Sequence, residues 1–405
     1  MAADTPDKPL ATLRSKLNPL YATLFPELFD RPEVVETRAT CDTCAMCDHG
    51  QLAPVQMDFF KPDAKCCTYH PGLANYLVGA VLADEGPELE EGRRRLRARI
   101  AARIGVTPQY IQAPRKYNLV YASARGAGFF GRAKNMMCPY FDAENDGRCT
   151  VWRYREAVCS TYFCKYTGGK PGWDFWDTLK GYLGFVERSL ARSSAKAIDP
   201  AVTEPVMERL TLTAEDVQDL PPKDSEYAQY WGTWVGREEE FYIACYRYVK
   251  DMKPENFALK IDDSPDGRGM IGRLTAKYDA IPSAETPPTL IRAKDLRKRV
   301  NEKTVVVTSY NPYDAFAVEK ELFEVLGKFK AEETVEQNLA RLDTEEDIQL
   351  APELVHYLFV HGVLVAPEAQ KEVKAAAPAP VKLQPHPLLV PKTTRAQRRA
   401  AKKKP

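Results

Sequence analysis

Apolar residues recur every three to four positions along much of the first 250 residues of this chain. This spacing is typical of helices that bury one face. It predicts helices over residues 73–82, 87–104, 175–197 and 226–250. The first of them is apolar all round, so we expect it to be buried. A short apolar run over residues 118–124 is predicted to form a strand.

The pattern changes near residue 290. Residues 262–292 are rich in proline and glycine, which favours a connection between domains. Residues 304–308 are β-branched and indicate a strand, and residues 317–326 are amphipathic. Over residues 303–366 the order strand, helix, helix, helix, strand predicts a small winged-helix-like module.

We therefore expect a mainly α-helical fold with little strand, in which helices wrap a cysteine-rich domain. A length of 405 residues exceeds one typical core, so several domains are expected. The predicted organisation is an irregular arm over residues 1–40, a cysteine-cluster metal-binding domain with a helical extension over 41–260, a linker over 261–300, the winged-helix-like module over 301–368, and a disordered basic tail over 369–405.

The overall charge is nearly balanced. Lysine and arginine number 57 against 56 acidic residues, so no global charge draws the chain to a polyanion. We find neither a signal peptide pattern nor an apolar run of membrane-spanning length, and we expect no membrane contact. A cytoplasmic location follows as the default, and structural disulfides are not expected there. The sequence leaves the oligomeric state open.

The cysteines carry the strongest chemical signal. Nine of the ten fall between positions 41 and 164, and only Cys245 lies outside. The nine candidate metal ligands are Cys41, Cys44, Cys47, Cys66, Cys67, Cys138, Cys149, Cys159 and Cys164. Zinc and iron–sulfur centres both take thiolate ligands, and a C-x2-C step lets one turn present two sulfurs to one ion.

The spacing leaves the cofactor undecided between zinc and an iron–sulfur cluster. Cys41, Cys44 and Cys47 form two overlapping C-x2-C steps, and Cys138-Pro139 has the Cys-Pro form of a ferredoxin ligand. Nine thiols exceed the four ligands of one zinc ion, which indicates more than one centre or spare cysteines. The alternative is a set of metal-free thiols that are buried or redox-active. Cys245 sits in an apolar helix and is interpreted as a buried small residue.

The second cysteine group also carries a family pattern. Cys138-Pro139-Tyr140-Phe141 is followed by Cys149-Thr150-Val151-Trp152, then by Arg155 and Cys159. This arrangement resembles the YkgJ-type cysteine-cluster family, over about residues 41–164. The resemblance implies chelation of zinc or iron. One relative, the flagellin lysine methylase, adds methyl transfer as a chemistry that the resemblance suggests.

The chain departs from the family pattern at several positions. Asp48 stands where a fourth cysteine would follow Cys47, and an adjacent pair appears later as Cys66-Cys67. Glu156 replaces the proline after Arg155, and Ser160 replaces an arginine. The assignment of individual ligands therefore does not follow from the family alone.

The leading function is metal binding, whose downstream role is unknown. Two other functions stay open. One is a metal-dependent enzyme, such as a protein methyltransferase, and the other is a regulatory module that binds nucleic acid or peptide. Residues 392–404 carry seven basic side chains and no acidic one, a composition suited to contact with a polyanion. Whether the chain is an enzyme is not decided by its sequence.

Overall fold

The structure is a computed structural model. It describes residues 11–34, 44, 46–47, 60–124 (backbone only at 122–124), 130–145, 147–204, 217–281 and 285–369. Within these ranges the protein is mainly helical, with small two- and three-stranded sheets, as predicted. The predicted basic tail from residue 370 onward lies outside the described residues.

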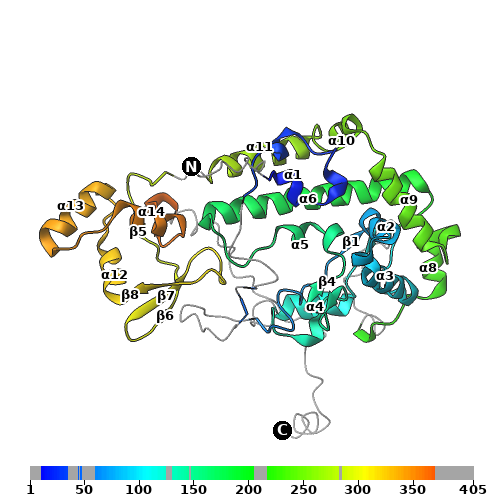
Figure 1. The fold of residues 1–405 in the computed structure, drawn as a ribbon, viewed down its shortest axis with the longest axis horizontal. Coiled ribbons are helices and arrows are strands. Elements are labelled where there is room, and N and C mark those ends of the chain that lie inside the picture. Colours follow the sequence, from blue (N-terminus) through cyan, green and yellow to red (C-terminus); the bar gives the residue numbers. More distant parts are fainter. Residues whose placement is uncertain are drawn as a thin grey trace, which may run out of the picture.

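A 30-residue helix, α6 (Gly169–Ile198), runs through the larger part of the molecule (Figure 1). It covers and extends the predicted helix over residues 175–197. Its buried positions, among them Phe175, Leu179, Leu183 and Leu190, recur at helical spacing and line one apolar stripe. Against this stripe pack α5 (Ala157–Thr161), α9 (Glu238–Lys250) and α11 (Pro265–Asp279).

Helix α2 (Asn75–Ala83) is buried almost throughout, which confirms the helix predicted over residues 73–82. The strand β1 (Leu73–Ala74) precedes it and pairs with β2 (Tyr110–Ile111). The second predicted helix appears as the turn η3 (Pro87–Leu89) and α3 (Glu90–Ala102).

Two local predictions were wrong. Residues 118–124 belong to a helix, α4 (Arg115–Ala124), in which the rings of Tyr117 and Tyr121 stack at a centroid distance of 5.6 Å, one helical turn apart. The helix predicted over residues 226–250 is two helices, α8 (Asp224–Trp231) and α9, separated by the turn η6 (Gly232–Trp234). Gly232 and Gly236 adopt positive φ angles there, a conformation that ends a helix.

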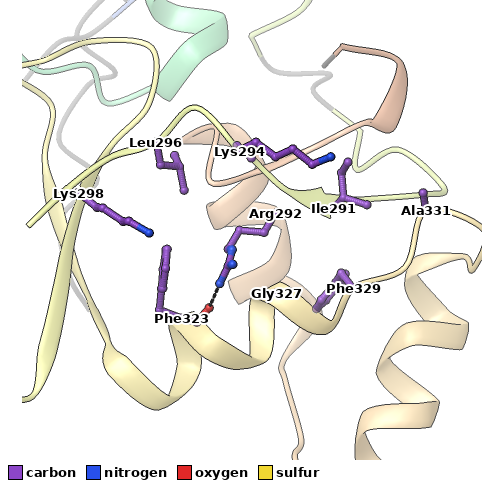
Figure 2. Close-up of a pocket in the computed structure, with 10 residues that line it drawn as sticks. Ile291, Arg292, Lys294, Leu296, Lys298, Phe323, Gly327, Phe329 and Ala331 are labelled. Carbon is purple, nitrogen blue, oxygen red and sulfur yellow. Dashed lines mark hydrogen bonds between the residues drawn. The ribbon is translucent and has the colours of Figure 1, made fainter. Parts of the chain in front are cut away.

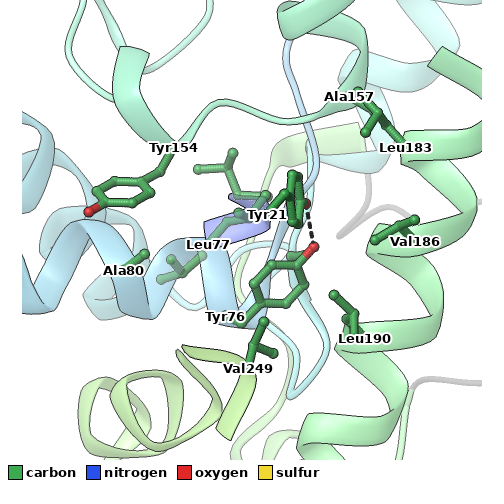
Figure 3. Packing of buried hydrophobic residues seen from close by; sticks show 14 of the residues in the cluster. Tyr21, Tyr76, Leu77, Ala80, Tyr154, Ala157, Leu183, Val186, Leu190 and Val249 are labelled. Atoms are coloured by element: carbon green, nitrogen blue, oxygen red, sulfur yellow. Dashed lines mark hydrogen bonds between the residues drawn. The ribbon is translucent and has the colours of Figure 1, made fainter. Parts of the chain in front are cut away.

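The N-terminal segment packs on the same core through α1 (Leu13–Lys16) and the turns η1 (Pro19–Tyr21) and η2 (Glu27–Asp30). Tyr21, Phe25 and Phe29 are buried and contact one another through their rings. The hydroxyl of Tyr21 is 2.7 Å from that of Tyr76, inside a shell of leucine and valine side chains (Figure 3). The described part of the predicted arm, residues 11–34, therefore contributes to the core.

A helix, α11, occupies part of the segment that the proline and glycine pattern indicated as a linker. Helix α10 (Pro254–Lys260) is followed by α11, which begins at Pro265, the N1 position that suits proline. Ser264 caps α11 by accepting a hydrogen bond from the amide of Gly267. Leu274 of α11 is buried in the core that α6 organises.

The C-terminal part has a second hydrophobic cluster, which includes Leu290, Val307, Leu342 and Leu358. Its strands are β5 (Ile291–Arg292) paired with β9 (Leu364–Val365), and the antiparallel sheet β6-β7-β8 (Arg297–Val300, Thr304–Thr308, Phe316–Glu319). Its helical elements are α12 (Lys320–Val325), η7 (Leu326–Lys328), α13 (Val335–Glu346) and α14 (Pro352–Val360). The amphipathic segment 317–326 thus begins as a strand and continues as a helix.

The loop over residues 309–315 joins this part to the larger one. The side-chain amide of Asn311 donates to the carbonyl oxygen of Cys164 at 2.8 Å. The backbone N–H of Tyr166 donates to Asp314 at 3.3 Å. At the start of α6, a Cβ on Gly169 would lie 2.5 Å from the carbonyl oxygen of Val360 in α14. Close backbone packing therefore links the two parts.

None of the helices in the described ranges combines the length and the apolar character that a membrane crossing needs.

Candidate functional site

Eight of the nine clustered cysteines lie in the described part of the chain, while Cys41 lies outside it. None of these eight forms a disulfide bond. They stand on four segments: a turn at 44–47, a series of turns over 62–69, the hairpin region 138–149, and the helix α5 with the residues after it. The structure brings these segments together.

The first segment is a tight turn. The amide of Cys47 donates to the carbonyl oxygen of Cys44 at 3.0 Å, so both residues of this C-x2-C step project from one turn. Cys47 pairs with Phe60 in an isolated parallel β-bridge, and the amide of Phe60 donates to the carbonyl oxygen of Met46 at 2.6 Å. Cys47 is 5% exposed, and burial raises the pKa of its thiol to about 12.

Cys66 and Cys67 follow Lys65, which adopts the left-handed conformation with φ 49°. Their two thiols are hydrogen-bonded to each other. This bond is the largest cause that lowers the pKa of Cys66, and the nearby cations Lys65 and Arg155 lower it further. The same bond, together with burial and the negative charge of Cys66, raises the pKa of Cys67. The carbonyl oxygen of Cys67 accepts from the amide of Cys138 at 2.7 Å, which ties the first cysteine group to the second.

The third segment is built on a short hairpin in which β3 (Phe141–Asp142) pairs with β4 (Arg148–Cys149). The amide of Tyr140 donates to the sulfur of Cys138 at 3.4 Å. The amide of Val151 likewise donates to the sulfur of Cys149. In both cases the donor follows the cysteine by two residues, so backbone N–H groups point at both sulfurs and favour their thiolate forms.

Burial opposes these hydrogen bonds. It is the largest cause that raises the pKa of both Cys138 and Cys149, against the amide donors and, at Cys149, the positive charge of Arg155. The thiols are therefore protonated near neutral pH unless a cation replaces the proton.

Cys159 lies on α5, whose N-terminus is capped by Glu156. The Glu156 carboxylate accepts from the amides of Val158 and Cys159 at 2.8 and 2.9 Å, and it is also hydrogen-bonded to the Cys159 side chain. Burial and the negative charge of Glu156 both raise the pKa of Cys159. Glu156 thus positions the helix that carries Cys159.

The thiols fall into two groups that meet at Cys66. Electrostatic interactions connect Cys66 with the first group, which we call the inner thiols: Cys67, Cys138, Cys149 and Cys159. Cys66 also packs with the second group, the outer thiols Cys44, Cys47 and Cys164. An aromatic shell formed by Phe60, Phe130, Tyr162 and Tyr313 surrounds the outer thiols.

Two further residues can be placed relative to the thiols. His70 is buried beside Tyr117 and Tyr140, and burial lowers the pKa of its ring to about 3, so it is neutral. Cys245 lies fully buried in the helical core and apart from the cluster, as predicted. Lys65 and the aromatic shell were not identified from sequence, because no spacing rule links them to the cysteines.

The donor set matches the chemistry of a thiolate-bound metal, but the side chains are not assembled into a coordination shell. In the ranges that the structure describes, no three His, Cys, Asp or Glu side chains are placed so that they could hold a metal ion. Instead, the thiols of Cys66 and Cys67 are hydrogen-bonded to each other, and the Cys159 side chain is hydrogen-bonded to Glu156. Binding would require deprotonation and a local movement of the sulfurs toward one another.

Comparisons of this chain with family models, with curated proteins and with solved structures find no match.

Proposed function

We propose that this protein binds zinc or an iron–sulfur cluster through its clustered cysteines. The observation that carries the proposal is the convergence of the inner thiols and Cys66 from three separate segments. Each of the four inner thiols interacts electrostatically with Cys66, so the five are unfavourable as thiolates together unless a cation neutralises them. Soft thiolate ligands favour zinc, copper(I) and iron–sulfur centres over hard cations.

Cys138, Cys149 and Cys159 are the ligands we assign first, with Cys67 or Cys66 as the fourth. The amide donors to Cys138 and Cys149 support this choice, because such hydrogen bonds orient metal-bound sulfur and tune the centre. The positive charge of Arg155 offsets part of the negative charge that four thiolates would bring.

The outer thiols form the remaining part of the candidate ligand set. Cys44, Cys47 and Cys164 supply three sulfurs, and Cys41 belongs to the same C-x2-C run. A second centre with these four residues is consistent with nine thiols exceeding the needs of one zinc ion. Cys66, which contacts both groups, then lies between the two centres.

Three finer proposals accompany this one. The protein is cytoplasmic, supported by the absence of disulfides among its described cysteines. The C-terminal part is a winged-helix-like module, supported by its three α-helices and the β6–β7 hairpin beside them. The basic residues from 392 to 404 contact a polyanion, supported by their charge alone.

Metal analysis of protein purified without oxygen tests the main proposal. We expect zinc or iron in stoichiometric amount, and a visible absorption spectrum distinguishes an iron–sulfur cluster from colourless zinc. A preparation that is folded, reduced and free of both metals would contradict the proposal.

Replacement of single cysteines tests the ligand assignment. Cys138→Ala, Cys149→Ala and Cys159→Ala should each lower the metal content sharply, because each removes one thiolate from the same centre. Cys245→Ala is the control, since it removes a buried thiol that lies outside the cluster. Loss of metal in the Cys245 variant alone would show that the assignment is wrong.

A further inference from the structure

A pocket of about 450 Å³ opens on the C-terminal part, between β5, β6 and α12 (Figure 2). It lies apart from the thiol cluster and has no role in the proposed metal binding. Three cationic side chains line it, Arg292, Lys294 and Lys298. Among the described residues that line the pocket, none is acidic. The electrostatic character of this pocket therefore favours an anion.

Arg292 is held in a defined position. Its guanidinium donates to the carbonyl oxygen of Phe323 at 2.6 Å, and its central carbon is 4.5 Å from the centre of the Phe323 ring. A Cβ on Gly327 would lie 2.8 Å from the same guanidinium, so the glycine leaves room for it. An arginine that is fixed in this way loses little side-chain entropy when it binds an anion.

Lys298 approaches the same ring from the opposite side. Its Nζ is 6.0 Å from the centre of the Phe323 ring, and Figure 2 shows the ring between this ammonium group and the Arg292 guanidinium. Both Lys294 and Lys298 are exposed, whereas Phe323 and Phe329 are 8% and 6% exposed. The pocket thus combines charge at its edge with an apolar wall.

The positive charge continues from the pocket along β6. All four residues of this strand are exposed, and Arg297, Lys298 and Arg299 are consecutive. Between residues 292 and 303 six basic side chains stand against two acidic ones, although the whole chain has a net charge of only +1. The charge is therefore concentrated on this edge strand, with Lys298 on the side that lines the pocket and Arg297 and Arg299 on the opposite side.

We propose that this surface, the pocket together with β6, binds single-stranded nucleic acid. One nucleotide enters the pocket, with its base against the apolar wall and its phosphate near Arg292 and Lys298. Neighbouring phosphates follow β6. A single strand can turn one nucleotide into a concave site, whereas a duplex keeps its bases stacked inside a rigid cylinder. A charged track with an adjacent apolar recess is the arrangement that recognises such a strand.

The test measures binding of a fluorescent thymidine oligonucleotide to the full chain over a series of salt concentrations. The tail binds polyanions on the proposal above, so the measurement is made in a background whose seven basic residues between 392 and 404 are changed to glutamine. The pocket variant is Lys294→Gln/Lys298→Gln. The matched control is Lys253→Gln/Lys260→Gln, two exposed lysines at the ends of α10.

We expect the pocket variant to bind about tenfold more weakly at fixed salt, and its salt dependence to become shallower by about two units of slope. The control should bind like its parent. Equal binding by the pocket variant and the control would overturn the proposal, as would loss of all binding on neutralisation of the tail. Equal affinity for a duplex would exclude the single-strand assignment. Binding of inorganic phosphate without the oligonucleotide would assign the pocket to a small phosphate compound instead.

Discussion

At the scale of single residues, two buried hydroxyl groups form a hydrogen bond inside the core. The hydroxyls of Tyr21 and Tyr76 meet at 2.7 Å, and their side chains are 3% and 0% exposed (Figure 3). A buried hydroxyl that loses its partner retains the cost of its desolvation. The loss of both hydroxyls should therefore cost less stability than the sum of the two separate losses.

Tyr76→Phe should lower the free energy of unfolding by about 1–2 kcal/mol, because it leaves the Tyr21 hydroxyl buried without its partner. Tyr21→Phe/Tyr76→Phe should cost less than the sum of the two single changes, by about 1 kcal/mol. Denaturant unfolding of the four proteins in this cycle measures the coupling. Strict additivity would show that the hydrogen bond contributes nothing.

Glu187 on α6 supplies a pH dependence. It is buried, accepts a hydrogen bond from the amide of Ala157, and faces the charges of Glu156 and Arg188. Burial, with Glu156 as a second cause, raises the pKa of Glu187 well above its usual 4.5. Above pH 4.5 the unfolded chain releases this proton while the folded chain keeps it. Stability is therefore lost as the pH rises through that range.

Glu187→Gln should remove this loss, because glutamine accepts the same hydrogen bond and cannot ionise. The variant should gain stability relative to the parent as the pH rises above 4.5, by up to about 1.4 kcal/mol for each pH unit until the folded-state pKa is reached. Chemical denaturation across this pH range provides the measurement. Glu332→Gln, at an exposed position, is the control and should show no such trend. A constant difference at all pH values would contradict the prediction.

At the scale of elements, the packing of α2 against α9 depends on one glycine. A Cβ on Gly79 would lie 1.9 Å from the carbonyl oxygen of Tyr242, so the two helices meet backbone to backbone. A carbonyl group within a helix cannot move aside without loss of its own hydrogen bond. The separation of the helices is set by the absence of a side chain at this position.

Gly79→Ala should therefore destabilise the protein by more than about 2 kcal/mol through overpacking. Gly181→Ala is the control, because Gly181 is exposed on α6 with nothing within 4 Å of the added Cβ. That change should instead stabilise the protein by about 0.5–1 kcal/mol through helix propensity. Thermal unfolding distinguishes the two. Similar midpoints would show that α2 can shift relative to α9.

At the scale of the whole molecule, the loop 309–315 connects the thiol cluster to the C-terminal part. The Asn311 side chain donates a hydrogen bond to the carbonyl oxygen of Cys164, and Tyr313 belongs to the aromatic shell around the outer thiols. The binding free energy of a metal in a thiolate site becomes folding free energy for the segments it joins. If the proposed metal binds, Asn311 and Tyr313 extend this stabilisation to the loop.

Removal of the metal should therefore loosen residues 60–70, 138–164 and 309–315. The second hydrophobic cluster should keep its fold, because its core is separate and contains no cysteine. Hydrogen exchange with and without a chelator tests this expectation, with β7 and α14 as the internal reference. Equal loss of protection in β7 and α14 would mean that the two cores unfold as one unit.

The sequence alone predicted the helical character of the fold and the helices now seen as α2, α3 and α6. Helical periodicity is a local property, since the residues that share a face lie within a few positions of one another. The candidate metal chemistry was predicted from sequence for a similar reason. The abundance and short spacing of cysteines can be seen without knowledge of the fold.

The tertiary structure decided which thiols meet. Cys67 and Cys138 come together through a backbone hydrogen bond between distant segments, and Cys164 packs in one cluster with Cys47. It also decided that residues 115–124 are helical and that the chain breaks between α8 and α9. Short segments with mixed propensity take the conformation that their surroundings stabilise, and the grouping of side chains from distant segments depends on how the helices pack.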